Sequence, residues 1–234
     1  MKKLTILLAF FCAVSASAQN EYAPIPVTDD NGERVMTGFE SMASLSDETS
    51  FVNLNLFVID SICSVKKDMI VSTDFDNHTL RFTMQVGSLP GSKLSNVYQV
   101  EVKVRIQDHR LMYYINNMKV LPGNSVFSRS ATEINKLTPE KRSSHAEIIE
   151  DVSQCVSAVV HSMLRFVAEN KPDTVAHWDE VKKGSAFKGM SEVEAKLAFG
   201  KPQYVSENRG EVQWMYSGSF HLFFENGKVT VIMK

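Results

Sequence analysis

Ser64 and Lys67 stand at the S-x-x-K spacing, which lets a lysine activate a serine hydroxyl for acyl transfer. Enzymes with this mechanism carry two further motifs, S-D-N and K-T-G, and the chain contains neither. The G-x-S-x-G turn, which presents a serine nucleophile in another class of hydrolases, is missing as well. Because a pattern with two fixed positions recurs by chance, we predict that the pair is coincidental and that the protein is not an enzyme.

Six histidines offer imidazole nitrogens, which are common metal ligands. They are His78, His109, His145, His161, His177 and His221. No two of them are four residues apart, as two ligands on one helix face would be, and none has zinc-finger spacing to a cysteine. We therefore predict neither a metal site nor a cofactor.

Trp178, Trp214 and Tyr216 could form an aromatic platform for a carbohydrate, which is a third kind of site that the residue types allow. Trp214 and Tyr216, however, fall on the same side of a predicted strand in a small sheet. Large side chains are needed there to cover the neighbouring helices. We predict that these aromatic residues pack in a core.

The first 18 residues have the three parts of a secretory signal peptide. Lys2 and Lys3 supply the charged start, residues 4–14 form a short apolar run, and Ala16-Ser17-Ala18 supplies small residues before the cleavage point. A membrane-spanning helix needs about 18 apolar residues or more, so this run is too short for an anchor. We predict cleavage after Ala18 and an exported protein without a transmembrane segment, located in the periplasm, at the outer membrane or outside the cell.

The formal net charge is -2 for the 234-residue chain and becomes -4 when Lys2 and Lys3 leave with the signal peptide. The lysines and arginines are scattered and form only short pairs such as Lys66-Lys67. A surface that binds nucleic acid needs basic residues dense enough to neutralise several phosphates. We therefore predict no binding to nucleic acid.

Cys63 and Cys155 remain after cleavage, in a compartment that favours disulfide bonds. Each lies in a predicted amphipathic helix, so a bridge would connect two helices. The other interpretation is two buried free thiols, since cysteine is among the most commonly buried residues. The spacing alone leaves both interpretations open.

The pattern of residues 19–170 predicts one α+β domain. In chain order we expect a hairpin that turns at Asp30-Asn31-Gly32, a helix over 46–63 with Ser46 as N-cap, strands at 79–86, 97–106 and 111–120, a polar loop to 137, and a helix over 143–168. The strand predictions depend on strict alternation of apolar and polar residues, which places one face in a core and the other in water.

Residues 171–234 predict a second, smaller domain. Helices are expected at 175–183 and 191–199, and strands at 203–207, 211–217, 219–225 and 228–233. Ser191 and Glu194 have the spacing of a capping box, and Gly200 stops the helix that they begin. Asn226-Gly227 between apolar runs is a strong signal for a hairpin.

Part of this second domain resembles the repeat of the SmpA/OmlA outer-membrane lipoprotein family and the related β-lactamase-inhibitor-protein fold. The matching segments are Gly189-Met190-Ser191, Phe199-Gly200-Lys201-Pro202, Trp214-Met215-Tyr216 and residues 223–229. The resemblance implies a non-enzymatic protein that docks onto other proteins through a concave sheet and its loops. Unlike the lipoproteins, this chain has no cysteine at its expected mature start, so no lipid tether is implied.

Residues 24–170 resemble a bacterial family of unknown function with a TATA-binding-protein-like (TBP-like) fold. The resemblance depends on the strand pair before Ser46, the helix to Ile62, the strands around Phe82, Val102 and Tyr113, and the closing helix. It implies a fold and not DNA binding, because the polar face of the clearest strand carries mixed charge.

The sequence thus predicts an α+β protein of two domains, each an antiparallel sheet with helices packed on one face. We expect a non-enzymatic, protein-binding role in the cell envelope, with an unidentified envelope or secreted protein as partner. The interaction surface is expected on the exposed strand face and turns of the second domain, around Asn208, Arg209, Gln213 and His221. The alternative is a small-ligand or lipid-binding protein, which would need an apolar cavity between the sheet and the long helix of the first domain.

Overall fold

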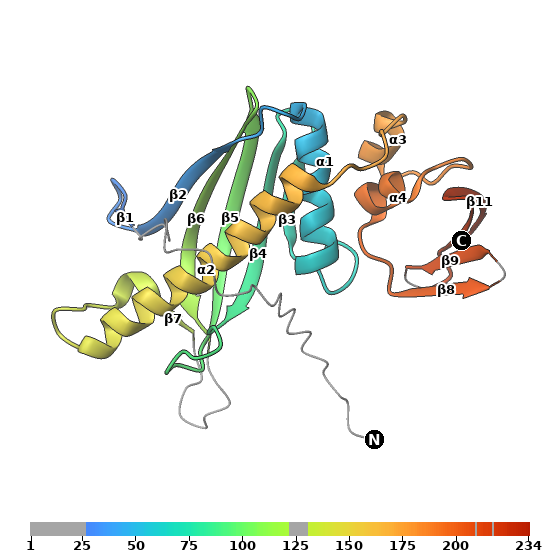
Figure 1. The fold of residues 1–234 in the computed structure, drawn as a ribbon. Coiled ribbons are helices and arrows are strands. Elements are labelled where there is room, and N and C mark those ends of the chain that lie inside the picture. Colours follow the sequence, from blue (N-terminus) through green and yellow to red (C-terminus); the bar gives the residue numbers. More distant parts are fainter. Residues whose placement is uncertain (1–26, 122–130, 209, 217) are drawn as a thin grey trace, which may run out of the picture.

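The computed structural model describes residues 27–121, 131–208, 210–216 and 218–234 (Figure 1). These residues form a seven-stranded sheet and a four-stranded sheet, both antiparallel, each with helices on one face. This arrangement confirms the predicted α+β class. The predicted signal peptide lies outside the described residues.

The first unit contains the larger sheet, whose strands follow the order β1-β2-β6-β5-β4-β3, with β7 paired to β6. The strands are β1 (Val27–Thr28), β2 (Arg34–Ser41), β3 (Ile70–Asp74), β4 (Thr79–Gly87), β5 (Val97–Gln107), β6 (Arg110–Val120) and β7 (Thr132–Glu133). β5 lies between β4 and β6, and its inward residues from Tyr98 to Ile106 are at most 1% exposed. The predicted alternation in this strand is therefore confirmed.

Two long helices cover one face of this sheet, as Figure 1 shows. α1 (Asp47–Phe57) begins at the predicted cap, where the Ser46 hydroxyl accepts a hydrogen bond from the Thr49 backbone N–H at 3.0 Å. A π-helical segment, Val58–Ile62, continues it. α2 (Ser143–Glu169) crosses the same face and packs against α1.

The structure corrects the prediction that the first helix is amphipathic, because α1 is buried on every side. Every residue from Ser50 to Ile59 is buried. Phe51 and Leu54 belong to the core under the first sheet, whereas Val52 and Leu56 belong to the core of the second unit. One helix thus contributes to both cores, which is why its apolar residues do not form a single stripe.

The second unit consists of two short helices and a four-stranded meander in the order β11-β10-β9-β8. Its elements are α3 (Trp178–Lys183), α4 (Glu192–Phe199), β8 (Tyr204–Asn208), β9 (Glu211–Met215), β10 (His221–Glu225) and β11 (Lys228–Met233). Asn226 and Gly227 both have positive φ, as the predicted two-residue hairpin requires. None of the described helices is long and apolar enough to span a membrane.

Two local predictions differ from the structure. The segment expected as a loop to residue 137 includes β7 and a 3-10 turn at Ile134–Lys136. α3 begins at Trp178 and not at residue 175, because Oε1 of Glu194 accepts hydrogen bonds from the backbone N–H groups of Ala176 and His177, both at 3.0 Å. These bonds hold the segment before α3 against the start of α4.

Candidate interaction surface

The second sheet has one face against α3 and α4 and one face that no described element covers. The inner face carries Trp214, Leu222, Phe224 and Val229, which are at most 4% exposed. The register places two rows of side chains on the other side, namely Tyr204, Met215, His221 and Met233, and Ser206, Gln213, Phe223 and Val231. We call these two rows the open face of the second sheet.

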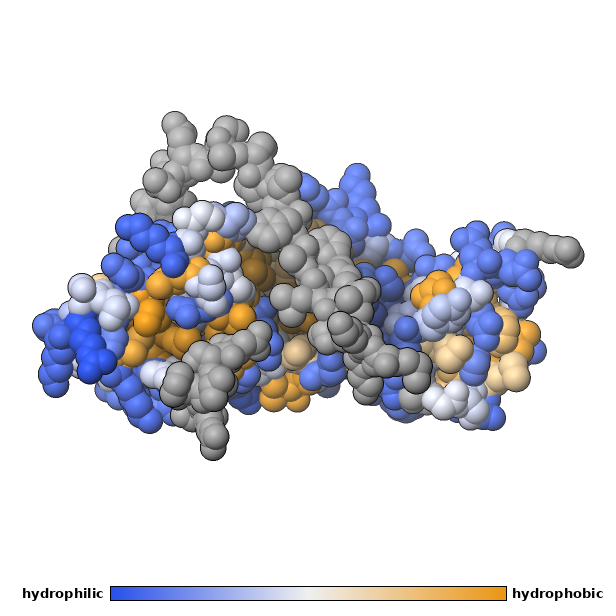
Figure 2. All heavy atoms as spheres, turned by 90° about the horizontal axis from the view of Figure 1, so that it is seen from below, coloured by the Kyte–Doolittle hydropathy of each residue, from blue (hydrophilic) through white to orange (hydrophobic). Residues whose placement is uncertain are grey.

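Apolar side chains dominate the open face of the second sheet. Tyr204 is 59% exposed, Met233 53% and Val231 45%. Figure 2 shows apolar residues at the surface of the second unit, among hydrophilic ones. Contiguous exposed apolar surface in a folded protein indicates a site that is covered by a partner.

Gln213 and His221 form the polar centre of this face. The Gln213 amide nitrogen donates a hydrogen bond to Nδ1 of His221 at 2.7 Å. The His221 ring is nearly parallel to that of Phe223, with 6.5 Å between the ring centroids. With Nδ1 as acceptor, the neutral ring carries its proton on Nε2, so His221 can donate a hydrogen bond to a partner.

The four residues predicted for this surface have different positions. Gln213 and His221 lie together on the open face, and Asn208 lies at the end of β8, opposite Glu211. Asn208 also lines an open pocket of 490 Å³ at the turns, together with Gly210, Glu211, Glu225 and Asn226. Arg209 lies outside the described residues. The structure thus describes three of the four predicted residues and brings Gln213 and His221 together.

Sequence reasoning missed the apolar part of the face, which includes Tyr204, Met215, Phe223 and Met233. The available signal was in β9 and β10, where apolar residues occur at both alternating phases. Apolar residues in both phases are typical of a strand that is covered on both faces. In this structure the described part of the chain covers only one face of the second sheet.

Lys67 of the S-x-x-K pattern connects the two units. Its ammonium group donates a hydrogen bond to the Leu197 carbonyl, in the last turn of α4. Burial lowers the pKa of Lys67 to about 8. Ser64, by contrast, is exposed, and its backbone N–H donates to Asp68 at 3.0 Å.

Both cysteines are free and buried in the structure, which corresponds to the second of the two interpretations and not to the bridge. Burial raises the pKa of each thiol to about 11. No group of three or more His, Cys, Asp or Glu side chains in the described ranges could hold a metal ion.

The first unit contains a buried polar cluster that sequence reasoning did not find. The Asp151 carboxylate, on α2, accepts hydrogen bonds from the hydroxyls of Ser88, Ser92 and Tyr98 at 2.6–2.7 Å. Burial and the bond to Asp151 raise the pKa of Tyr98. The cluster attaches the β4–β5 connection to the long helix, so we assign it a structural role.

The ligand-binding alternative needs an apolar cavity between the sheet of the first unit and α2. Side chains of the first core fill the space between the sheet and α2, including Val100, Val102, Val156 and Met163. The second pocket, of 310 Å³, opens at the surface and is lined by Glu33, Glu101, Asn116, Asn117, Met118, Glu133 and Asn135. Its polar lining does not fit a lipid.

Comparison with known proteins gives the fold of part of the chain. The sequence matches no protein-family model and no curated protein. The structure is similar to a TBP-like protein from Parabacteroides distasonis, with a TM-score of 0.51 and 10% identity over 61% of this chain and 97% of that one. A second similar structure is a DUF4468 family protein from Bacteroides ovatus, with a TM-score of 0.46 and 11% identity over 64% and 93% of the two chains. At these identities the likeness concerns the fold alone, and the part of the chain that matches the first of these structures has a TBP-like fold.

Proposed function

We propose that this protein is an exported, non-enzymatic component of the cell envelope that binds another envelope or secreted protein. The observation that carries the proposal is the open face of the second sheet, where apolar side chains lie on both sides of a histidine–glutamine pair. Tyr204 is on β8 at one edge, and Phe223, Val231 and Met233 are on β10 and β11 toward the other. Aromatic residues and methionine are enriched in protein interfaces. A polar pair within such a patch supplies orientation and specificity.

The charges at the turn end of this face indicate the chemistry of the partner. Glu211 and Glu225 are opposite each other in neighbouring strands, next to Asn208, and Lys228 is the opposing residue on the other side of Glu225. Like charges directly opposite each other destabilise a sheet, so a cation placed there by a partner would be favoured. We propose a partner with an apolar contact region flanked by a basic group.

The test begins with the tagged mature protein, residues 19–234, captured from cross-linked cells of its source, with a tag-only control and identification by mass spectrometry. The partner found is then purified and titrated against three proteins. These are the unchanged chain, Val231→Asp and the control Val71→Asp. Val71 is a comparable choice because it is also an exposed strand valine, 53% exposed against 45% for Val231, but lies in the first sheet.

We expect Val231→Asp to weaken binding by about a hundredfold, since an interface core tolerates a charge poorly, and Val71→Asp to leave it within about twofold. Circular dichroism melting of both variants verifies that the fold is intact. The proposal fails if no specific partner is recovered, or if both variants bind as the unchanged chain does.

Export is tested separately, because it depends on residues 1–18. We expect the full chain to be processed in its source, with Gln19 as the first residue of the mature protein in N-terminal sequencing. Fractionation should place it outside the cytoplasm. Replacing Leu7 and Leu8 with charged residues should retain the unprocessed chain in the cytoplasm.

A further inference from the structure

The sheet of the first unit also has a face that none of the described helices covers, since α1 and α2 both pack on the other one (Figure 1). The register brings cations from three strands together on it. Arg105 on β5 is opposite Thr79 on β4 and Met112 on β6, and Lys103 is opposite Arg81 and Tyr114. Arg110 lies at the start of β6, one row beyond Arg105. We call Arg81, Lys103, Arg105 and Arg110 the basic band.

Two of the four cations in the basic band have no ion-pair partner among the described residues. Glu101 pairs with Arg81, and Asp74 lies near Arg105, whose charge contributes to lowering the pKa of Asp74 after the larger effect of hydrogen bonds from Asn77. Lys103 and Arg110 are exposed and form no ion pair with any described residue. The end of this face around Lys103, Arg105 and Arg110 therefore carries an excess of positive charge among the described residues.

Apolar groups border the basic band on the side of β2 and β6. Phe39 is 70% exposed and is opposite Met112, which is 36% exposed. The Arg110 guanidinium lies over the Phe39 ring, 6.0 Å from its centroid. A ligand that covers this face must therefore offer both anionic and apolar groups.

We propose that the open face of the first sheet binds an acidic, extended polypeptide segment that also carries apolar side chains. Lys103 and Arg105 are two positions apart in one strand, about 7 Å along it, which is the spacing of alternate side chains in an extended peptide. Carboxylates at alternate positions can thus face both cations, and an apolar side chain at one end can cover Phe39. This surface is distinct from the open face of the second sheet, and its proposal stands or fails independently.

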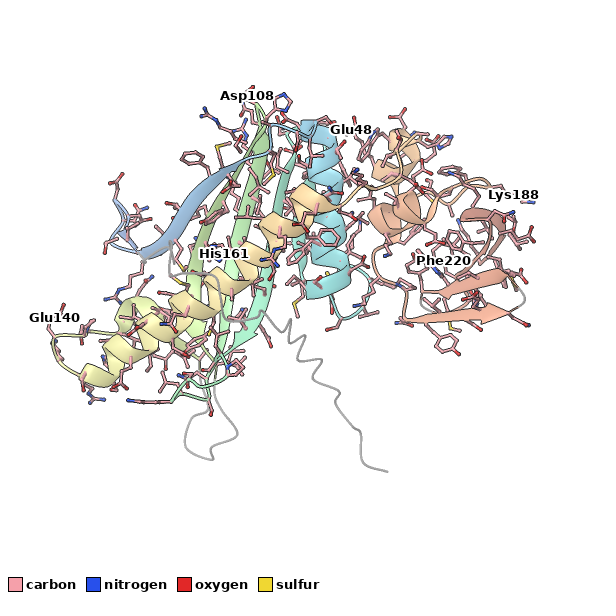
Figure 3. All side chains as sticks on the ribbon, in the orientation of Figure 1. Glu48, Asp108, Glu140, His161, Lys188 and Phe220 are labelled. Atoms are coloured by element: carbon pink, nitrogen blue, oxygen red, sulfur yellow. The ribbon has the colours of Figure 1, made fainter. Side chains whose placement is uncertain are left out.

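The test uses the mature protein and a fluorescein-labelled peptide of alternating glutamate and alanine, with phenylalanine at one end, in an anisotropy titration. We expect saturable binding that weakens about tenfold between roughly 0.05 and 0.3 M salt, as screening reduces attraction between exposed charges. The double variant Lys103→Glu/Arg105→Glu should lose about tenfold or more in affinity. The control Lys171→Glu/Lys188→Glu changes the net charge equally at exposed positions, and Lys188 lies on the second unit, far from this sheet (Figure 3).

A second comparison tests the apolar contact. Phe39→Ala should weaken binding of the phenylalanine-containing peptide about fivefold, yet leave a peptide with alanine in its place unchanged. If the two double charge variants lost the same affinity for the peptide, net charge alone would explain the binding, and the proposal would be overturned. An absence of saturable binding would do the same. Tighter binding of a thymidine oligonucleotide or a heparin fragment than of the peptide would overturn the assignment of a polypeptide.

Discussion

The backbones of Lys66 and Lys201 pair as an isolated antiparallel bridge between the two units. The Lys66 N–H donates to the Lys201 carbonyl at 2.8 Å, and the Lys201 N–H donates to the Lys66 carbonyl at 2.9 Å. The Lys201 ammonium group also donates to the Asp60 carbonyl at 2.9 Å, at the end of the first helix. Together these contacts fix the start of the second meander against the first unit.

Gly200 permits this close approach, and we predict that Gly200→Ala destabilises the protein by about 3 kcal/mol or more. Its φ is +80°, and a Cβ there would lie 2.3 Å from the carbonyl carbon of Lys66. Gly189→Ala is the matched control, since Gly189 has φ +89° but open space around its Cβ position. It should cost only about 1 kcal/mol. Urea denaturation measures the free energy of unfolding of both variants. Equal losses would show that the positive φ, and not the contact with Lys66, causes the destabilisation.

Lys67 should make the stability depend on pH in the alkaline range. Burial lowers its pKa from 10.5 to about 8, so between these values the unfolded chain binds a proton that the folded chain does not. The free energy of unfolding therefore gains a contribution that rises with pH from about 8 to 10.5. Lys67→Met should remove that contribution, whereas Lys188→Met, at an exposed position, should keep it. Denaturation at several pH values gives the free energy of unfolding of all three proteins. The same change with pH in all three would contradict the prediction.

Glu194 should make the free energy of unfolding depend on pH in the acidic range, because its charged form stabilises the fold. Burial by itself would raise its pKa, but hydrogen bonds from the Ser191 backbone, the His177 ring and the Ala176 and His177 backbones lower it below 4.5. Its stabilisation is present above pH 4.5 and is lost as the pH falls through the folded-state pKa. Glu194→Gln should cost about 2 kcal/mol at neutral pH, and this difference should shrink in acid.

The control for Glu194 is Glu192→Gln, a half-buried position in the same helical turn. Its effect should be below about 0.5 kcal/mol at every pH. The free energies of unfolding of Glu194→Gln and the unchanged protein are compared from neutral pH down to about pH 3. If their difference stayed constant, the charged form of Glu194 would not be what stabilises the fold.

Asp151→Ala should destabilise the first unit by about 3 kcal/mol, because it leaves the hydroxyls of Ser88, Ser92 and Tyr98 without their acceptor. Asp151→Asn retains an acceptor oxygen and should cost less. Glu147→Ala, at an exposed position of the same helix, should change the stability by less than about 0.5 kcal/mol. Thermal unfolding followed by circular dichroism distinguishes the three, and equal effects would rule out a structural role for the cluster.

The shared helix α1 should make the two units unfold together. Both tryptophans are in the second unit, and Trp178 also contacts Glu48 and Phe75 of the first. Their fluorescence therefore reports on the second unit and its contact with the first, whereas circular dichroism reports on the whole chain. We expect the two denaturation transitions to coincide. Val102→Ala, deep in the first core, should shift the fluorescence midpoint as far as the circular dichroism midpoint. A shift in circular dichroism alone would mean that the units unfold independently.

Several parts of the fold could be predicted from local sequence. Strict alternation in 97–106 marks one core-facing side, and the Ser191–Glu194 capping box and the Asn226-Gly227 turn act within a few residues. Such signals are local, because the period of a strand and the geometry of a cap or turn depend on neighbours in the chain. Sequence reasoning named only polar residues for the candidate site. Apolar residues at both phases of β9 and β10 indicate two covered faces, but they do not say whether this chain or a partner covers the second one.

By itself, then, the amino-acid sequence determined the α+β class, the position of most helices and strands, and the inward face of β5. Only the tertiary structure decided that α1 serves two cores, that Lys67 joins the units, and that cations from β4, β5 and β6 share one face. The physical reason is distance along the chain. Strand register and the packing of one unit on another bring together residues whose local sequences carry no information about each other.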